Sequence, residues 1–577
     1  MIGTIFYPLS RVITAISLFF STLFGGGGLA AAAGNAPPSL QPLLYPKWIH
    51  EHWVYENEGD TDTVRAFVDG FKERGIPVGA VMLDRPWELN DVGTFTPDPD
   101  RYWDFACEKR HLDGKPDPNC EDCLLCYFQN GGTKVLLWAS CMINESAGDV
   151  HAYAKEKGYF LSGGKVIKWW GGNGSMIDYT NPEAVKFWEG QLDKVLNLGI
   201  DGFKLDGADP YVMLLLPAYG KSGLVGWKQY QKLQYEHFYN YTKSHKQSNA
   251  ILTRATDDLI GWGIPLRFMS RDINFSGWTG DRDSDWGGIR QAMNTMFTSA
   301  MFNYASYGSE IGGFRGPDEP VKDIFIRWAQ LGAFSPVMLN GGGGQYHRPW
   351  LYDDETVAVY KKFTGLHYEL IPYISSQVMY SYEQGQPTMR PQFGVPYQYM
   401  LGDELLVAPF YQESADNTRT VYFPLGDEWI YLFDESKTYK GGGIKKLHFP
   451  YEEAPAFIRN GAILPMDDLD GEFTTVRVYP TKGGNSFGLY EEGMRGSTLS
   501  YTMGGGLTLK STATPRALLW RVYGAAEPAQ VSLNGTALAK AGSLAQLKTQ
   551  TTGYCMAEGA LWVAVKDAAA GAEIVIK

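Results

Sequence analysis

The feature that most constrains the fold is an alternation of two patterns between about residue 45 and residue 395. Short apolar runs alternate with amphipathic stretches of helical periodicity, at intervals of roughly 50 residues. Eight such units predict parallel strands linked by helices, and closure into a (β/α)8 TIM barrel is the expected α/β architecture. The strand candidates are residues 78–83, 134–139, 200–206, 251–255, 275–278, 302–307, 335–339 and 388–392.

The segments between these runs favour helices over residues 62–74, 181–198 and 366–383. Asn181 followed by Pro182 is a good helix start, because asparagine caps a helix and proline fits its first turn. A doubly wound open sheet would need a Gly-x-Gly-x-x-Gly loop after its first strand, and the sequence has none there. The barrel is therefore the preferred architecture.

The pattern changes at about Pro396. Helical periodicity gives way to short alternating runs separated by glycine-rich turns, which is typical of one or two C-terminal β-sandwich domains. The expected division is residues 1–34 as a signal peptide or anchor-like segment, 35–395 as the barrel, 396–470 as a proximal β-sandwich and 471–577 as a distal β-sandwich.

The first residues form a separate segment, in which Arg11 precedes an apolar run at 12–24 and small residues follow at 29–34. The run is shorter than the about 20 residues of a membrane span and suits the core of a secretory signal peptide. A retained membrane anchor and a wrongly assigned gene start are the alternatives. We therefore expect a secreted or secretory-pathway protein, membrane-anchored if the segment is retained.

The composition narrows the function classes. The net charge of −13 offers no electrostatic footprint for nucleic acid or an anionic membrane. The 67 glycines and 14% aromatic residues suit a protein that binds flat, hydroxyl-rich ligands, and nine histidines leave little room for a histidine-built metal centre. Four of the six cysteines lie close together at Cys107, Cys120, Cys123 and Cys126, for which disulfides, free thiols and a zinc site remain open.

In a barrel of this kind the reacting groups lie at the C-terminal ends of the strands and on the loops that follow. This rule reduces 64 acidic residues to a short list. Carboxylates there would accept hydrogen bonds from sugar hydroxyls, and nearby tryptophans would stack on the C–H side of a sugar ring. The charged residues at or after the predicted strand ends are Asp84, Lys204, Asp206, Asp209, Arg254, Asp281 and Glu310.

Hydrolysis of a glycosidic bond needs two carboxylates with different roles. Asp206 is the preferred nucleophile, because Lys204 points the same way along the strand and would keep Asp206 ionised. Asp281 is the preferred acid/base, because its glycine- and tryptophan-rich loop would desolvate it and raise its pKa. Read from spacing alone, either aspartate could equally cap a helix or close a loop.

Over residues 45–470 the sequence resembles glycoside hydrolase family 31, the retaining α-glucosidase, α-xylosidase and α-galactosidase superfamily. Residues 202–206 (GFKLD) resemble the nucleophile motif of the family, and residues 278–281 (WTGD) resemble its acid/base motif. Further family-like motifs stand in family order, which makes the set much more specific than any one of them. They cover residues 177–184, 311–314, 327–336, 370–373, 389–391, 402–409 and 455–465.

The resemblance implies a retaining exo-acting α-glycosidase, first of all of α-glucosidase type, with Asp206 as nucleophile and Asp281 as acid/base. It implies an oligosaccharide or glycoside substrate, without a cofactor or metal. An α-galactosidase, an α-xylosidase and a non-catalytic carbohydrate-binding protein are the alternatives, and the oligomeric state is left open. The substrate-binding residues that it implies are Asp84, Trp138, Lys204, Asp209, Arg254, Trp278, Glu310 and His347.

The sequence departs from the family pattern in three places. Asp209 stands where the family has Glu, and Glu310 stands where it has Asp, so the carboxylate oxygens move by about a bond and the glycone preference becomes uncertain. Family members also carry an N-terminal β-sandwich that lends a loop to the active site. Only a short stretch separates the signal-like segment from the first predicted helix, so we expect a shortened form or a missing gene start.

Overall fold

The structure is a computed structural model that describes residues 46–106, 123–206, 209–254, 273, 276–301, 304–316, 321–343, 347–392, 394–469, 471–492 and 494–577. All of the described elements belong to one unit, residues 44–577. The signal-like segment at 1–34 lies outside the described residues. Within these ranges, no helix has the length and apolar character needed to span a membrane.

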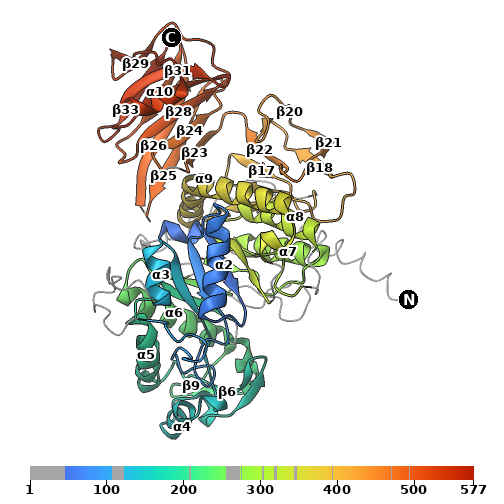
Figure 1. Ribbon diagram of the computed structural model, residues 1–577, viewed down its shortest axis with the longest axis vertical. Helices are drawn as coiled ribbons and strands as arrows, with labels where there is room; N and C mark the ends of the chain where they lie inside the picture. Colours follow the sequence, from blue (N-terminus) through green and yellow to red (C-terminus); the bar gives the residue numbers. More distant parts are fainter. Residues whose placement is uncertain are drawn as a thin grey trace. The chain divides into compact units, whose positions relative to one another are not determined.

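The centre of the fold is a parallel sheet whose strands occupy eight positions around a barrel (Figure 1). The order around the sheet is β12-β11-β10-β7-β3-β2-β1-β14-β13, so β12 and β13 lie at its two edges. Ser309 alone separates these two strands in the chain, and this one segment therefore joins both edges and closes the barrel. The strands are β1 (His52–Glu56), β2 (Ala80–Leu83), β3 (Lys134–Ala139), β7 (Gly202–Leu205), β10 (Ala250–Thr253), β11 (Ser276–Trp278), β12 (Tyr307–Gly308), β13 (Glu310–Ile311) and β14 (Met338–Gly342).

The barrel and its C-terminal β domains confirm the predicted fold class, but one predicted barrel strand was wrong. Residues 388–392 contain β15 (Met389–Pro391), which pairs antiparallel with β16 (Tyr399–Leu401) outside the barrel. The missing position is filled by β1, which pairs in parallel with both β14 and β2. Every residue of β1 is buried, so its sequence shows no alternation of apolar and polar residues that would mark it as a strand.

Helices cover the outside of the barrel sheet (Figure 1). The predicted start of α5 is confirmed, because the Asn181 side chain accepts a hydrogen bond from the Glu183 amide and Pro182 is the first helical residue. The helix that follows the last barrel strand, α9, begins twelve residues earlier than the periodicity indicated, at a start capped by Asp353. The helices are α2 (Thr61–Glu73), α3 (Leu124–Asn130), α5 (Pro182–Leu196), α6 (Trp227–His245), α7 (Trp286–Met301), α8 (Lys322–Ala333) and α9 (Asp354–Gln384).

Two insertions extend the C-terminal end of the barrel, after β3 and after β7. The first holds a small antiparallel sheet and α4 (Asp149–Glu156), and the second holds η4 (Asp209–Leu215) and a two-stranded hairpin. The short elements of the two insertions are β4 (Met142–Asn144), η2 (Glu145–Ala147), η3 (Leu161–Gly163), β5 (Ile167–Trp169), β6 (Gly172–Met176), β8 (Tyr219–Gly220) and β9 (Gly223–Leu224). The remaining 3-10 helices are η1 (Lys47–His50) and η6 (Pro349–Leu351).

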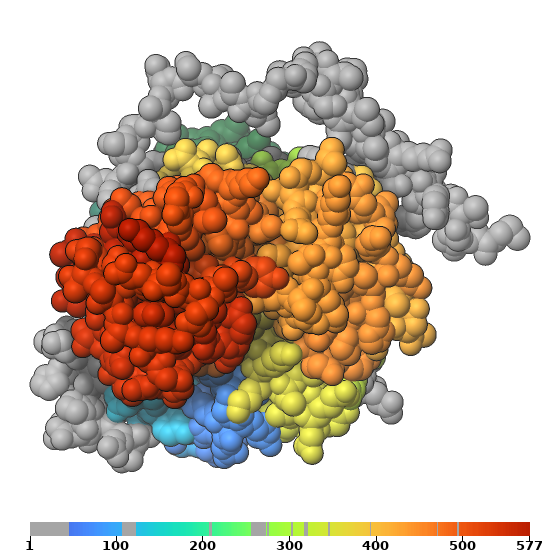
Figure 2. All heavy atoms as spheres, turned by 90° about the horizontal axis from the view of Figure 1, so that it is seen from above, coloured from blue at the N-terminus to red at the C-terminus, as the bar shows by residue number. Residues whose placement is uncertain are grey.

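After α9 the chain forms two β modules, drawn mainly in orange and in red in Figure 2. The proximal module consists of a six-stranded sheet and the β18–β21 pair. Its aromatic core includes Phe423, Trp429 and Phe457. The distal module contains a five-stranded and a six-stranded sheet. The proximal strands beyond β15 and β16 are β17 (Leu405–Val407), β18 (Thr418–Phe423), β19 (Glu428–Tyr431), β20 (Thr438–Lys440), β21 (Gly443–His448) and β22 (Ala456–Arg459). The distal elements are β23 (Ile463–Asp467), β24 (Thr474–Val478), β25 (Gly484–Glu491), β26 (Met494–Met503), β27 (Leu507–Ser511), β28 (Leu518–Tyr523), β29 (Val531–Leu533), β30 (Thr536–Ala537), α10 (Leu544–Thr549), β31 (Thr552–Ala557), β32 (Ala560–Val565) and β33 (Ala572–Ile576).

The cysteines show no disulfide where the structure describes them. Cys123, Cys126, Cys141 and Cys555 are all buried, and no disulfide joins any two of them. Cys107 and Cys120 lie outside the described residues. No group of three His, Cys, Asp or Glu side chains within the described ranges is arranged to hold a metal ion.

Candidate active site

The strand ends bring the predicted catalytic residues together around Asp206, which directly follows β7. The Arg254 Nη1 atom donates to Asp206 Oδ1 at 2.8 Å, and the Trp138 indole Nε1 donates to Asp206 Oδ2 at 3.2 Å. Arg254 follows β10 and Trp138 lies in β3, so the two strands that flank β7 each supply one donor. Both carboxylate oxygens are thereby held in a fixed orientation.

These contacts control the charge of Asp206. Burial alone would raise its pKa, but the charges of Arg254 and Lys204 and the hydrogen bonds from Arg254 and Trp138 outweigh burial and lower the pKa below its usual value. Asp206 is therefore ionised at neutral pH. The charge of Lys204 is one of the causes of the lowered pKa, as expected from its position two residues before Asp206.

Asp281 contacts the same atom of Arg254 and lies three residues beyond the end of β11. Its Oδ1 atom is 3.5 Å from Arg254 Nη1, and its side chain is 28% exposed. Since Asp206 Oδ1 is 2.8 Å from the same nitrogen, these two oxygens can be no farther apart than the sum of the two distances. Gly280 makes this approach possible, because it has φ of +75° and a Cβ atom there would lie 2.6 Å from Arg254 Nε.

Lys204 forms a second charged centre beside the first. Its ammonium donates to Asp84 Oδ2 at 2.7 Å and lies 4.0 Å from Glu310 Oε1. The same nitrogen is 3.9 Å from the centre of the Tyr55 ring and 4.9 Å from that of Trp278. Burial lowers the pKa of Lys204, but the neighbouring carboxylates more than reverse this and raise it, so the ammonium stays charged.

Glu310 differs from Asp206 in its protonation state. Burial raises its pKa to about 8, against the opposing charge of Lys204, so the carboxyl group is protonated at neutral pH. The Tyr55 hydroxyl donates to Glu310 Oε1. Oε2 is buried and has no hydrogen-bond partner among the described residues. This carboxyl group can therefore donate or accept a hydrogen bond at the strand ends.

Two of the remaining predicted residues, Trp278 and His347, also lie at or after the C-terminal ends of barrel strands. Trp278 is fully buried at the end of β11, where Arg254 lies 5.6 Å from its ring centre. His347 is buried, and burial lowers its pKa to about 3. Its Nδ1 atom is 3.0 Å from the Ile311 carbonyl, which can only accept, so Nδ1 carries the proton. The side chain of Asp209 lies outside the described residues.

Tryptophans form one wall of this site. Trp138 stacks on Trp169 with ring centres 6.5 Å apart, and Trp170 meets Trp169 edge-on at 4.8 Å. Trp169 is buried and donates its indole N–H to Asn144 Oδ1 at 2.8 Å, so it supports the wall, whereas Trp170 is 49% exposed. Burial therefore separates the two residues, and only Trp170 is open to contact with a ligand.

Tyr55 is a residue of this site that sequence reasoning missed. It lies in β1, the strand that the sequence analysis did not identify, and it contacts both Lys204 and Glu310. The available signal was the helix predicted at 62–74, which has no predicted strand before it. A (β/α)8 barrel begins with a strand, and His52–Glu56, with Trp53, Val54 and Tyr55 at its centre, lies in that place.

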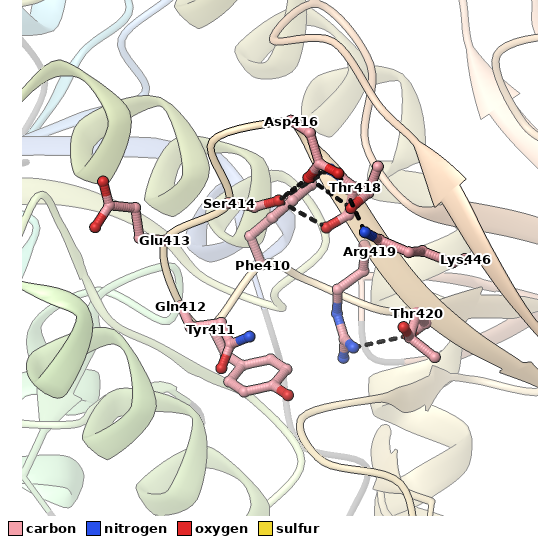
Figure 3. Close-up of a pocket in the computed structure, with 10 residues that line it drawn as sticks. All are labelled: Phe410, Tyr411, Gln412, Glu413, Ser414, Asp416, Thr418, Arg419, Thr420 and Lys446. Carbon is pink, nitrogen blue, oxygen red and sulfur yellow. Dashed lines mark hydrogen bonds and ion pairs between the residues drawn. The ribbon is translucent and has the colours of Figure 1, made fainter.

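A cavity of about 270 Å³ lies on the proximal β module (Figure 3). Asp416 is held there by Lys446 at 3.1 Å and by Thr418 at 2.7 Å. Glu413 points away from this group in Figure 3. The cavity therefore lacks two carboxylates that face a common space, which glycosidic bond cleavage requires.

A (β/α)8 barrel with two carboxylates near one arginine nitrogen at its strand ends, and with tryptophans beside them, is typical of the sugar-processing class of barrels. Sequence comparison gives a family. The TIM-barrel domain of the glycosyl hydrolases family 31 matches residues 42–377, and the C-terminal domain of the same family matches residues 374–464. The chain therefore belongs to glycosyl hydrolase family 31.

Curated relatives include an α-xylosidase of Emericella nidulans, 26% identical over 74% of this chain and 54% of its own length. An isomaltosyltransferase of Sporosarcina globispora is 25% identical over 81% of this chain and 46% of its own length. The chain thus spans about half the length of these relatives. Among solved structures, a family 31 dextranase of Flavobacterium johnsoniae complexed with glucose superposes with a TM-score of 0.80 at 20% identity, over 93% of this chain and 71% of that one. This likeness concerns the fold.

Proposed function

We propose that this protein is a retaining, exo-acting α-glycosidase that hydrolyses terminal α-linked sugars, with an α-glucoside as its first expected substrate. The observation that carries the proposal is the sharing of Arg254 Nη1 between Asp206 and Asp281. The greatest separation that these two distances to Nη1 allow between Asp206 Oδ1 and Asp281 Oδ1 stays below the roughly 6.5 Å at which the carboxyl pairs of inverting enzymes begin. This spacing favours direct attack by a carboxylate over attack by a water molecule placed between the two groups.

In the first step Asp206 attacks the anomeric carbon. The bond from that carbon to the leaving oxygen breaks as a β-linked ester to Asp206 forms, and Asp281 gives its proton to the leaving oxygen. The charges of Arg254 and Lys204, which keep Asp206 ionised, support this role. The greater exposure of Asp281 suits a group that must reach the leaving oxygen and later water.

In the second step Asp281 takes a proton from water, and the water oxygen attacks the anomeric carbon of the ester. The bond to Asp206 breaks, and the sugar leaves with α configuration. The hydrogen bond from Trp138 to Asp206 Oδ2 remains available in both steps. It can stabilise the charge that returns to the carboxylate when the ester breaks.

The group around Lys204 is proposed to hold the terminal sugar. Asp84, fixed by the Lys204 ammonium, offers carboxylate oxygens to sugar hydroxyls. Protonated Glu310 can donate a hydrogen bond from its buried Oε2 atom. The buried Trp278 ring lies beside Lys204 and forms part of the wall of this group. His347 and Asp209 belong to the same proposed set because they follow the C-terminal ends of the barrel strands β14 and β7.

The substitution Asp206→Asn tests the nucleophile. We expect kcat on a nitrophenyl α-glucoside to fall by at least about 10⁴-fold, as removal of a nucleophile does, while binding of the substrate persists. A non-catalytic carbohydrate-binding protein would show no hydrolysis in the parent chain.

Proton NMR of the first product formed by the parent enzyme measures the anomeric configuration of the released sugar. We expect α-configured sugar, and β-configured sugar would contradict retention.

The substitution Asp281→Asn tests the acid/base separately. Hydrolysis of an alkyl α-glucoside should fall by about 10²–10⁴-fold, whereas an α-glucosyl fluoride, which needs no proton on its leaving group, should still react with Asp206. Added azide should restore turnover by attacking the ester in place of activated water. The matched control is Asp283→Asn, in the same loop, because Asp283 is 58% exposed and pairs with Arg315. We expect near-parental activity for this control.

A panel of nitrophenyl α-glucoside, α-xyloside and α-galactoside tests the glycone. The panel includes xylose as well as glucose because the similar proteins include an α-xylosidase and an isomaltosyltransferase. We expect the largest kcat/KM for the α-glucoside. A larger value for the α-xyloside or α-galactoside would move the assignment to that sugar without changing the mechanism.

A further inference from the structure

A second cavity opens at the same end of the barrel as the candidate active site. It has a volume of about 810 Å³ and lies between the insertion after β3 and the segment after β7. Both insertions follow C-terminal strand ends, as Asp206 does. They also contact each other, because the ring centres of Trp169 and Tyr211 are 6.3 Å apart. The cavity therefore lies on the side of the barrel from which substrate would enter.

The walls of this cavity are held by hydrogen bonds between the two insertions. The Tyr219 amide donates to Ser162 Oγ at 3.1 Å, and the Lys221 amide donates to Asp178 Oδ2 at 2.7 Å. The next amide, of Ser222, donates to Thr180 Oγ1 at 3.2 Å. The β8–β9 hairpin is thus attached to the first insertion by its backbone amides, and these hydrogen bonds hold the two walls of the cavity together.

The charge of the lining is positive, although the whole chain carries −13. Lys157, Lys165 and Lys221 line the cavity, and Asp178 is the one acidic residue in the lining. Asp178 is buried and accepts hydrogen bonds from Thr180 and the Lys221 amide. Lys165 donates to the Leu214 carbonyl and Lys221 to Asn181 Oδ1, both neutral groups. The positive charge of these two ammonium groups is therefore available to a ligand.

A further feature of the lining suits an anion that is attached to a ring. Leu216 and Tyr219 on the lining are 58% and 54% exposed. A ring with an apolar face can cover them, which a small inorganic ion cannot do.

From this combination we propose that the cavity is an accessory binding site for an anionic saccharide, whose carboxylate or sulfate groups pair with Lys165 and Lys221 while a sugar ring packs on Tyr219. The proposal rests on the cavity itself and is independent of the proposed hydrolysis. A charged glycan held there would keep its neighbouring chain ends close to the mouth of the barrel.

The test is isothermal titration calorimetry on the full chain carrying Asp206→Asn, so that binding is measured without turnover. The probes are tetragalacturonate, sulfated maltotetraose, neutral maltotetraose and sodium sulfate. We expect one or both anionic tetrasaccharides to bind at least 10-fold more tightly than the neutral one, with an affinity that falls as salt rises. The carboxylate and sulfate probes separate the two sources of charge.

The variant Lys165→Gln/Lys221→Gln should weaken this binding by at least 10-fold, and Tyr219→Ala should weaken it by about 3- to 10-fold. The matched control is Lys440→Gln/Lys445→Gln, which removes the same charge from exposed residues of the proximal β module, and it should bind as the parent does. Circular dichroism shows which variants are folded. If the Lys165→Gln/Lys221→Gln variant is not folded, the single variant Lys221→Gln replaces it in the titrations.

Three results would overturn the proposal. They are equal binding by the Lys165→Gln/Lys221→Gln variant, neutral maltotetraose binding as tightly as the charged probes, and sodium sulfate alone binding as tightly as the sulfated sugar. Because every titration uses the Asp206→Asn chain, a failure here leaves the hydrolytic mechanism untouched. Loss of hydrolysis in the parent chain likewise leaves these titrations unaffected.

Discussion

At the scale of single residues, two carboxyl groups in one site hold opposite protonation states. Asp206 and Glu310 are both buried and both lie near Lys204. The difference comes from Arg254, which donates to Asp206 and so holds the pKa of that carboxyl below its usual value. Glu310 receives one hydrogen bond from the neutral Tyr55 hydroxyl, and burial raises its pKa to about 8. Direct pairing with a cation therefore decides which carboxylate is available for attack.

The raised pKa of Glu310 predicts a particular pH dependence of stability. Between its unfolded value of 4.5 and about 8, the folded state keeps a proton that the unfolded state releases, so rising pH favours unfolding in this window. Glu310→Gln removes this penalty. Its free energy of unfolding relative to the parent should rise by roughly 2–4 kcal/mol from pH 5 to pH 8, at about 1.4 kcal/mol per pKa unit.

Urea denaturation at several pH values measures this difference. Glu413→Gln is the control, because Glu413 is exposed on the proximal module and its substitution should give a difference that does not change over the same window. A Glu310→Gln curve that runs parallel to the parent from pH 5 to pH 8 would show that Glu310 is ionised in the folded protein.

At the scale of elements, the helices followed their local signals more closely than the strands did. The helix expected at 62–74 is α2, which begins one residue earlier because Asp60 and Thr63 form a reciprocal capping box. The strand β1, by contrast, is defined by its two neighbours β14 and β2. Capping depends on residues three positions apart, whereas strand pairing depends on segments that are distant in the sequence.

The cap of α2 gives a testable stability effect. Asp60→Ala removes the side chain that accepts from the Thr63 amide at 2.9 Å, and we expect a loss of about 1 kcal/mol in the free energy of unfolding. Asp60→Ser should restore most of it, because serine can accept the same hydrogen bond. Guanidinium denaturation of the three proteins measures the effect, and equal loss in the alanine and serine variants would contradict a capping role.

At the scale of the whole described unit, a charged cluster joins the barrel to the distal β module. Lys47 in η1 and Arg516 in the distal module both pair with Glu491 of β25. Arg516 also contacts Asp467 at 2.8 Å and donates to Thr474 Oγ1 at 2.7 Å. Its side chain is 16% exposed, so solvent screens these pairs less than it screens pairs on the open surface.

Arg516→Met tests this connection. Removal of one partner leaves Glu491 and Asp467 partly buried with less compensating charge, and we expect a loss of roughly 1–3 kcal/mol in the free energy of unfolding. The control Lys510→Met breaks an exposed pair with Glu573 and should cost less than about 1 kcal/mol. Differential scanning calorimetry compares the two, and a similar small change in both variants would contradict a stabilising role for the cluster.

The sequence by itself determined the barrel class, the later β modules, the capped start of α5 and the motifs around Asp206 and Asp281. These features depend on periodicity, on turn residues and on spacings within one segment. The tertiary structure decided which segment fills the eighth barrel position, that Tyr55 belongs to the site, and that Trp169 is buried while Trp170 is exposed. It also decided that Asp206 and Asp281 share one arginine and that Glu310 keeps its proton. Each of these depends on distances between residues far apart in the chain and on exclusion of water, and both arise only when the strands close around a common axis.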